Sequence, residues 1–514
     1  MADGGAPYGA SIVEAPLASQ ASAFDSFAIR ELGVPQAVLM ENAGRQAAYL
    51  VQRMFPTGRV VGFVGAGNNG GDALVLLRTL QGWGRSVEAV MTSHREGPDA
   101  LLHGWPVPRS GPGDLQGLEA RLAGAVIIDG ILGTGIQGPP RSVAAATIEM
   151  INRCPTQAVV ALDTPSGVDG DTGAVPGAVV RADVTVAFGW PKLGTLLHPA
   201  RPFAGRILAV EIGFPPVHRT DWARVITSGW AEAALPRRSS DTHKNRVGAL
   251  CLLAGSAMPG AAVLAARSAF RAGCGVVRVG GTAEMRSLLL EACPEAIWFD
   301  ADDRVALLDA VEASTALAAG PGMGTHDAAR NRLDHLLRGR STQGLVLDAD
   351  ALSMVAPAES NPVEGPVLVT PHPGEMARLT ASAVAEVQAD RPGSARRLAK
   401  RTGWAVLLKG APSLVAGPDG RLMVAMLGSS DLAVAGMGDV LTGAASALVA
   451  QGIDVFTAGA LALHLTGRSA WTAGKGVSLT PTDVISGLAD AIAEQPAPAP
   501  PHAPFVTFDQ PSPR

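Results

Sequence analysis

The run Gly65-Ala66-Gly67-Asn68-Asn69-Gly70-Gly71-Asp72 follows an apolar stretch at 60–64 and precedes an apolar, helix-like stretch at 73–80. Glycines at such a strand–helix junction let backbone N–H groups approach a phosphate, because a helix N-terminus favours an anion. The spacing also matches a dinucleotide fingerprint, with Glu88 near its expected acidic position. Asp72 argues against that plain site, because a carboxylate in the first helical turn repels a pyrophosphate. We therefore expect a ligand that combines phosphate with hydroxyl or cation chemistry.

Length and composition indicate a soluble, multidomain protein rather than a nucleic-acid-binding or membrane protein. A chain of 514 residues exceeds one hydrophobic core, and 47% apolar residues against 17% charged allow two large cores. A net charge of -5 without blocks of like charge gives no sign of a nucleic-acid partner. Four scattered cysteines, the lack of a signal peptide and the lack of a bilayer-length apolar stretch predict a cytoplasmic location.

Strand-like and helix-like stretches alternate in two series, which predicts α/β domains with parallel sheets. Strands are expected at 60–64, 87–91, 125–129, 158–163, 184–188 and 207–212, and again at 249–254, 276–280, 316–319, 344–348, 367–370 and 405–409. We expect one domain at 1–220, a linker at 221–240 and a second domain at 241–495. The proline-rich segment 496–514 is expected to be a disordered tail.

Three acidic residues of the first series, Asp72, Asp129 and Asp163, adjoin glycine-rich loops near expected strand ends. Open α/β sheets bind ligands at the carboxyl ends of their strands, so these carboxylates can converge on one crevice. The alternative for each single residue is a turn or helix cap.

The second series contains Ala435-Gly436-Met437-Gly438-Asp439 before a long apolar helix. Backbone N–H groups of such a turn can hold a transferring phosphoryl group, while the aspartate accepts a proton from the attacking hydroxyl. The alternative is an ordinary helix start with an acidic residue. Loops at 320–324, 348–352, 370–375 and 409–413 also follow expected strands and favour the functional interpretation.

In the first half, Met40-Glu41-Asn42-Ala43-Gly44, the 68–72 loop, Asp129 with its glycine loop, and 163–167 occur in order. Together they resemble the epimerase domain of the NAD(P)H-hydrate repair enzymes, over about residues 15–215. The resemblance implies a Rossmann-like fold that interconverts the R and S hydrates, with Asp163 at the reacting centre. Lys192 is a second candidate near the site, and the alternative for it is a solvated loop lysine. It implies substrate contacts by Asn68, Asn69, Gly70, Gly71, Asp72, Gly133, Thr134, Gly135, Ile136, Gln137, Gly138, Pro139 and Asp163, and a potassium ion held by Asn69, Asp129 and Ser166.

In the second half, the loops named above, with His243-Lys244 and 255–261, resemble the ADP-dependent dehydratase of the same repair pathway, which has a ribokinase-like fold. The resemblance covers about 241–493. It implies that ADP, or ATP in some relatives, phosphorylates the hydrate hydroxyl, and that loss of phosphate restores NAD(P)H. Mg²⁺ is expected with the nucleotide. The implied contacts are Lys409, Gly410, Ala411, Pro412, Ser413 and Gly438 to the nucleotide, and Ala261, Gly322, His372 and Asp439 to the hydrate, with Asp439 as base.

Two residues depart from the family patterns. Ala73 stands where the first loop usually continues with glycine; its methyl is tolerable in a helix but could narrow the approach to the ligand. Met437 stands where Ser or Thr is usual, which removes one hydroxyl from the anion hole but leaves its backbone donors. We expect an altered rate rather than lost function.

The sequence thus predicts a bifunctional enzyme of small-molecule substrates (NADHX, NADPHX and ADP), with epimerisation first and dehydration second, releasing AMP and phosphate. The family also implies a homo-oligomer. The alternative is a ribokinase-like small-molecule kinase fused to a nucleotide-binding module without catalysis.

Overall fold

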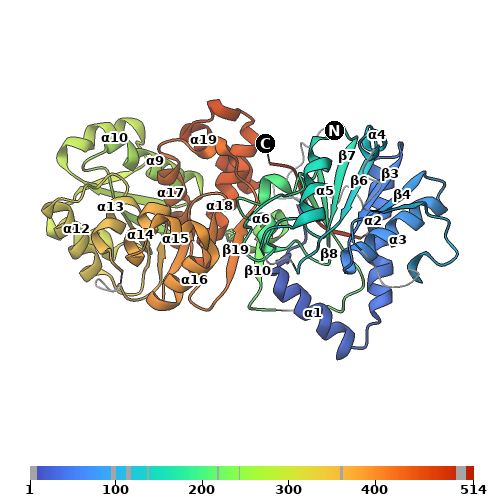
Figure 1. Ribbon diagram of the computed structural model, residues 1–514. Coiled ribbons are helices and arrows are strands. Elements are labelled where there is room, and N and C mark those ends of the chain that lie inside the picture. The colour runs from blue at the N-terminus through green and yellow to red at the C-terminus, as the bar shows by residue number, and fades with distance from the viewer. Residues whose placement is uncertain are drawn as a thin grey trace. The chain divides into compact units, whose positions relative to one another are not determined.

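The computed structural model describes residues 8–93, 100–111, 117–135, 138–216, 219–241, 243–358, 363–493 and 505–513. The chain forms two compact units (Figure 1). The first unit comprises Met1–Arg224 and Ala497–Arg514, and the second comprises Val225–Pro496. Both units are α/β, as the alternation of strands and helices predicted. In the described part of the chain, no helix combines the length and the apolar character needed to cross a membrane.

The sheet of the first unit is parallel from β9 to β5 and has an antiparallel edge. Its strands, in spatial order, are β1 (Tyr8–Gly9), β20 (Val506–Gln510), β9 (Arg206–Val210), β8 (Val184–Phe188), β7 (Ala158–Leu162), β6 (Val126–Gly130), β3 (Val60–Val64), β4 (Val87–Met91) and β5 (Arg109–Ser110). The central strands β3, β6, β7 and β8 are buried along their whole length, because their continuous apolar runs suit a sheet that is covered on both faces.

Alternate residues of each central strand enter different cores of the first unit. Val60 and Val64 pack with α2 and α3 on one face, whereas Val61 and Phe63 pack with α4 and α5 on the other. The helices are α1 (Ala18–Arg30), α2 (Gln36–Met54), α3 (Asn68–Gly82), α4 (Leu118–Leu122), α5 (Ser142–Arg153) and α6 (Leu193–Leu196). The loops that follow the parallel strands all reach the same edge of the sheet.

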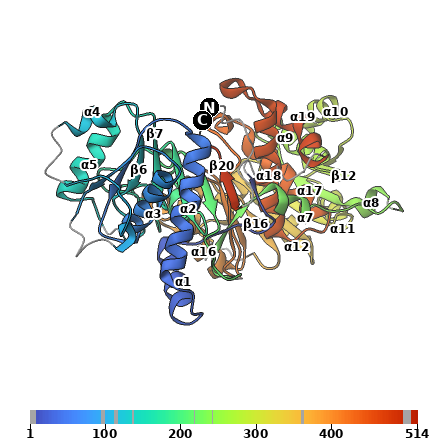
Figure 2. The same cartoon turned by 90° about the vertical axis from the view of Figure 1, so that its right-hand side faces the viewer.

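The end of the chain forms a strand, so the prediction of a disordered tail is wrong for Val506–Gln510. This strand, β20, pairs antiparallel with β9 and belongs to the sheet of the first unit (Figure 2). Phe508 is fully buried, and the Asp509 carboxylate accepts hydrogen bonds from Arg206 at 2.8 and 2.5 Å. The segment is ordered because it covers the otherwise open edge of β9.

The predicted linker at 221–240 also contains regular structure. It includes β10 (Ala223–Ile226), which pairs antiparallel with β2 (Glu14–Ala15), and α7 (Ser228–Ala234). Thr227 caps α7, since its side chain accepts a hydrogen bond from the Trp230 N–H at 3.1 Å.

The second unit contains a mainly parallel sheet that ends in two antiparallel pairings. Its strands, in spatial order, are β13 (Ile297–Asp300), β12 (Val276–Gly281), β11 (Ala249–Leu253), β14 (Ala316–Ala319), β15 (Gly344–Leu347), β16 (Val367–Val369), β17 (Ala405–Leu408), β18 (Leu414–Ala416) and β19 (Leu422–Ala425). The strands from β13 to β17 are parallel, and β18 is antiparallel to both β17 and β19. This arrangement is consistent with the ribokinase-like fold expected for this half.

Small residues bring two helices of the second unit into close contact. A Cβ at Gly443 of α17 would lie 2.1 Å from the Ala265 carbonyl oxygen of α9, so only glycine fits there. The helices are α8 (Lys244–Val247), α9 (Pro259–Arg271), α10 (Arg286–Ala292), α11 (Arg304–Glu312), α12 (Asp327–Gly339), α13 (Ala349–Val355), α14 (Pro373–Thr380), α15 (Val384–Ala389), α16 (Arg391–Thr402), α17 (Met437–Ala450), α18 (Val455–Ala473) and α19 (Pro481–Ala493). The close contact fixes α17, whose first turn carries Asp439.

Candidate active sites

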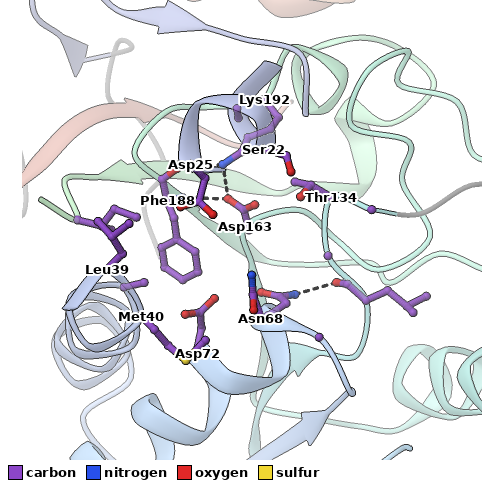
Figure 3. A pocket seen from close by; sticks show the side chains of 18 of the residues that line it. Ser22, Asp25, Leu39, Met40, Asn68, Asp72, Thr134, Asp163, Phe188 and Lys192 are labelled. Carbon is purple, nitrogen blue, oxygen red and sulfur yellow. Dashed lines mark hydrogen bonds and ion pairs between the residues drawn. The ribbon is translucent and has the colours of Figure 1, made fainter. Parts of the chain in front are cut away.

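A cavity of about 620 Å³ lies in the first unit, lined by α1, α2 and the loops after several parallel strands (Figure 3). The structure brings many of the predicted substrate residues into its wall, namely Asn68, Asn69, Asp72, Gly133, Thr134, Gly135 and Asp163. Ile136 and Gln137 lie outside the described residues. The cavity is therefore built where the sequence predicted a crevice.

Glycines of the first loop serve close backbone packing behind this wall. A Cβ at Gly65 would lie 1.9 Å from the Ile131 carbonyl oxygen, and one at Gly70 would lie 2.1 Å from the Gly65 carbonyl oxygen. Gly70, Gly71, Gly138 and Pro139 are not among the described residues that line the cavity. The substrate contacts of these four residues stay predictions. For Gly70 the structure shows a role in close backbone packing against Gly65.

Asp163 is held in a fixed geometry at the end of β7. Its φ of 63° lies in the left-handed region, which aspartate tolerates better than most residues and which often marks functional sites. Its carboxylate forms an ion pair with Lys192 and accepts a hydrogen bond from the Phe188 N–H at 3.1 Å. Lys192 also donates to the Phe188 carbonyl oxygen at 2.9 Å, and its side chain is 3% exposed. Lys192 is thus a partner of Asp163 rather than a solvated loop lysine.

Sequence reasoning missed Asp25, which enters the same cavity from α1 (Figure 3). Burial raises the pKa of Asp25, and the negative charge of Asp163 raises it further. Burial likewise raises the pKa of Asp72 well above its ordinary value, with added contributions from Asp163 and Asp25. No local pattern around Asp25 distinguishes it from a polar residue on an amphipathic helix. We call Asp25, Asp72, Asp163 and Lys192 the carboxylate cluster.

Asn69, Asp129 and Ser166, predicted to bind potassium, lie together beside the cavity. Ser166 donates to Asp129 through its hydroxyl at 2.6 Å and its N–H at 2.8 Å, and its Oγ accepts from the Leu132 N–H at 2.9 Å. Asn69 Nδ2 donates to the Leu132 carbonyl oxygen at 2.7 Å, whereas its buried Oδ1 has no hydrogen-bond partner among the described residues. Burial raises the pKa of Asp129 to about 6, against the opposing effect of the Ser166 hydrogen bonds.

The second unit places Asp348, Lys409 and Asp439 together at the carboxyl ends of its parallel strands. Lys409 Nζ lies 2.8 Å from Asp348 Oδ1 and 3.7 Å from Glu375 Oε2. Thr442 of α17 donates to Asp348 Oδ2 at 2.7 Å. Burial alone would lower the pKa of Lys409, but Asp348 and then Glu375 raise it above its ordinary value. Burial raises the pKa of Asp439 to about 6, with Asp348 adding to the effect and Lys409 opposing it.

Arg391, which sequence reasoning also missed, holds the loop at 409–413 in place. Its guanidinium donates to the carbonyl oxygens of Lys409 and Pro412, each at 3.0 Å. Burial lowers the pKa of Arg391 to about 10. Ser413 Oγ accepts from the Gly410 N–H at 3.1 Å. A Cβ at Gly438 would lie 3.5 Å from Lys409 Nζ, so this loop meets the start of α17 as expected for one site.

The predicted hydrate contacts of the second unit occupy two neighbouring loops. Gly322 has a φ of 59°, and a Cβ there would lie 3.1 Å from the Ala261 Cβ, so these two residues adjoin. His372 caps α14, since its Nδ1 accepts from the Gly374 N–H at 3.0 Å, while its Nε2 lies 3.5 Å from Glu375 Oε1. His372 therefore has a structural role as a helix cap, although half of its side chain is exposed.

The two residues that depart from the family patterns, Ala73 and Met437, both pack against apolar clusters. Ala73 is fully buried, and a Cβ at Gly130 of β6 would lie 2.7 Å from its methyl. Ala73 is absent from the described cavity lining, so its methyl does not narrow the approach to the ligand. Met437 packs against an apolar cluster that includes Val440, Leu479 and Ile485.

Two known protein families match this chain, one in each unit. Residues 36–194 match the family model described as YjeF-related protein N-terminus, and residues 250–489 match the one described as NAD(P)H-hydrate dehydratase. The chain is 34% identical over 470 residues to the bifunctional NAD(P)H-hydrate repair enzyme of Moorella thermoacetica, covering 85% of this chain and 88% of that protein. It is also 34% identical over 459 residues to the enzyme of Leishmania infantum, covering 80% of each.

A solved structure of ADP/ATP-dependent NAD(P)H-hydrate dehydratase from Bacillus subtilis, co-crystallised with ATP and Mg²⁺, is 32% identical, with a TM-score of 0.48 over 53% of this chain and 98% of that one. The family assignment depends on the long matches to curated relatives. The chain therefore belongs to the family of bifunctional NAD(P)H-hydrate repair enzymes, with the epimerase in its first unit and the nucleotide-dependent dehydratase in its second.

Proposed function

We propose that the first unit epimerises R and S NAD(P)HX at the carbinolamine carbon, with Asp163 as its catalytic carboxylate. The observation that carries this proposal is the Asp163–Lys192 ion pair in the wall of the cavity. Epimerisation at such a carbon requires proton transfer at the hydroxyl and stabilisation of a cationic ring. A fixed carboxylate supplies both, and the glycine-rich loops nearby offer backbone N–H groups to the phosphates.

The second unit then dehydrates the S hydrate with ADP as the preferred nucleotide. Asp439 accepts the proton of the hydrate hydroxyl as that oxygen attacks the terminal phosphorus, and loss of phosphate restores NAD(P)H and leaves AMP and phosphate. With its pKa near 6, Asp439 is mostly anionic at neutral pH, as a base must be. Lys409 and the 410–413 loop are placed to bind the nucleotide phosphates, with Lys409 already neutralised in part by Asp348.

Two ions belong to this proposal, Mg²⁺ in the second unit and K⁺ in the first, and the protein would bind them differently. Among the described residues, no group of three or more His, Cys, Asp or Glu side chains is arranged to hold a metal, so Mg²⁺ would arrive with the nucleotide phosphates. Asn69 Oδ1, the Asp129 carboxylate and Ser166 Oγ are the oxygen donors that would hold K⁺, and the unpartnered Oδ1 favours such an ion. Bound K⁺ would fix the 131–135 loop at the cavity. This assignment predicts that the first unit unfolds at a higher temperature in K⁺ than in Na⁺. The Asn69→Leu variant should lose this difference.

Separated R and S hydrates, incubated with the purified chain with and without ADP, test the proposed function. We expect the S hydrate to regain NADH absorbance only when nucleotide is present. The R hydrate should regain it after conversion to the S hydrate. A stable phosphorylated product without recovered NADH would instead support the alternative of a small-molecule kinase. Parallel reactions with ATP, and with NADPHX, determine the preferred nucleotide and hydrate.

We also propose a cytoplasmic location, supported by four cysteines that are all free thiols. The homo-oligomer implied by the family stays a prediction, which light scattering of the purified chain tests.

A further inference from the structure

The carboxylate cluster holds more negative charge than its single cation can balance. Among the described residues that line the cavity, the ionisable side chains are Asp25, Asp72, Asp163 and Lys192. The lysine is already engaged by Asp163. Unpaired carboxylates this close together cannot all ionise without a large electrostatic cost, so at least one of the remaining two retains its proton near neutral pH.

Asp72 is the carboxylate best placed to retain that proton. Asp72 is 8% exposed, and its carboxylate has no hydrogen-bond or ion-pair partner among the described residues. The charged groups that face it are Asp163, Asp25 and Lys192, and burial is the largest reason why its pKa lies well above the ordinary value. Helix α2, which packs on α3, contributes Gln36, Leu39, Met40 and Ala43 to the cavity, and none of these side chains titrates.

Asp72 and Asp163 reach the cavity from different elements. Asp163 follows β7 beside Lys192, whereas Asp72 projects from α3 (Figure 3). In Figure 3 the Asp72 carboxylate points into the cavity, with the ring of Phe188 beside the space that separates it from Asp163. A flat six-membered ring in that space would have one carboxylate nearer to each of its faces.

We propose that epimerisation uses both carboxylates, with Asp72 as the proton donor and Asp163 as the proton acceptor. This inference rests on the epimerase function proposed above. Asp72 gives its proton to the hydroxyl of the hydrate, the carbon–oxygen bond breaks, and water leaves with the electron pair of that bond. The lone pair of the ring nitrogen forms a carbon–nitrogen double bond, which gives a planar iminium ion.

A solvent water then adds to the opposite face of that ion. Its oxygen forms the new carbon–oxygen bond, the electron pair of the double bond returns to nitrogen, and the Asp163 carboxylate takes the released proton. One water leaves, one enters, and one proton has moved from Asp72 to Asp163. The resulting enzyme form catalyses the reverse conversion by the same steps, so one site serves both epimers.

The test incubates the R hydrate with the protein in water enriched in ¹⁸O, without nucleotide, and measures epimerisation and the oxygen isotope of the product. The unaltered chain should incorporate one solvent oxygen for every epimerisation, faster than the hydrate exchanges without enzyme. Asp72→Asn keeps the shape of the side chain but removes its acid, and should slow epimerisation by about 100- to 10,000-fold. Glu149→Gln, at an exposed carboxylate of α5 outside the cavity, is the matched control and should stay within about twofold.

The pH profile supplies a readout that a purely structural role of Asp72 would not move. The kcat/KM for epimerisation should fall at alkaline pH, where Asp72 loses its proton, and the residual activity of Asp72→Asn should lack this alkaline limb. An unaltered chain that does not epimerise the hydrate would contradict the proposed function itself. An active chain whose product retains its original oxygen, or an Asp72→Asn variant with the full rate and an unchanged alkaline limb, would overturn only the inference. The isotope and pH measurements on the unaltered chain do not depend on how the variant folds.

Discussion

The two units each bring an aspartate and a lysine to the carboxyl ends of a parallel sheet, but they pair them differently. In the first unit Lys192 binds Asp163 itself, the proposed catalytic carboxylate. In the second unit Lys409 binds Asp348, and the proposed base Asp439 lies nearby at the start of α17. The first arrangement stabilises a fixed anion beside a ring that becomes cationic. The second leaves the base free to take a proton and the lysine close to the incoming phosphates.

The units also differ in how the chain completes them. The second unit is one continuous segment, Val225–Pro496, whereas the first requires residues from both ends of the chain. Its sheet includes β20, which is joined to β9 by the ladder and by the Arg206–Asp509 pair. The difference means that the stability of the epimerase unit depends on residues that follow the dehydratase unit in sequence.

The largest expected effect is the loss of β20. A chain ending at residue 504 should lose about 3–6 kcal/mol of stability in the first unit, since Val506 and Phe508 lie buried in its core. Calorimetry and heat inactivation of each activity measure this, and only the epimerase should become heat-labile. Phe508→Ala should reproduce most of the loss, whereas Thr507→Ala, at an exposed position of the same strand, should not. Equal loss of both activities would contradict the comparison.

The two aspartates should separate the activities. Asp163→Asn should lower epimerisation by about 100- to 10,000-fold while the S hydrate is still dehydrated, and Asp439→Asn should do the reverse. Asparagine is chosen at 163 because it tolerates the left-handed backbone there, which alanine would strain. Assays of each hydrate with and without ADP measure both rates. Epimerisation that survives in Asp163→Asn would show that the first unit does not use this carboxylate.

The two lysines should affect their units through different kinetic constants. Lys192→Met leaves the partly buried Asp163 without its cation, so kcat for epimerisation should fall about 10- to 100-fold. Lys409→Met should raise the KM for ADP more than it lowers kcat, because Lys409 is proposed to bind the phosphates rather than the reacting hydroxyl. Arg391→Lys keeps the positive charge beside the 409–413 loop but loses the fork of guanidinium donors. It therefore shows how far the loop position alone affects the KM for ADP. If both lysine variants change kcat alone, the proposed difference between the sites is wrong.

The dehydratase should lose activity in acid. Asp439 must be anionic to act as base, and with its pKa near 6 the kcat/KM should fall by about tenfold from pH 7 to pH 5. Initial rates with S hydrate and ADP, in buffers that keep the protein folded, measure this limb. A flat profile over that range would argue against Asp439 as the base.

The smallest effect is expected from Met437. Its side chain packs in an apolar cluster, so Met437→Ser should change dehydratase kcat by no more than a few-fold and should slightly destabilise the start of α17. A rise in kcat of a hundredfold or more would mean that the missing hydroxyl limits the reaction.

The sequence alone predicted two α/β units, and it named most of the side chains that the structure places at the two candidate sites. Asp163, Asp439 and the glycine-rich loops follow apolar strands directly, and parallel strands direct such loops to one edge of the sheet. Local sequence also revealed Lys192 and Lys409, since each stands within or beside one of these loops. The resemblance to a known family then connected these residues to one substrate.

Only the tertiary structure decided which side chains meet from distant elements. Asp25 enters the cavity from α1, and Arg391 of α16 supports the 409–413 loop, yet neither has a local pattern that differs from a surface residue on an amphipathic helix. The order of Val506–Gln510 depends on the open edge of β9, which no feature of that short segment specifies. Ala73 turned out to face Gly130 because the register of α3 on the sheet directs its methyl inward. Local sequence determines strands, helices and loops by propensity and periodicity, whereas contacts across the fold depend on packing that is fixed only when all elements are in place.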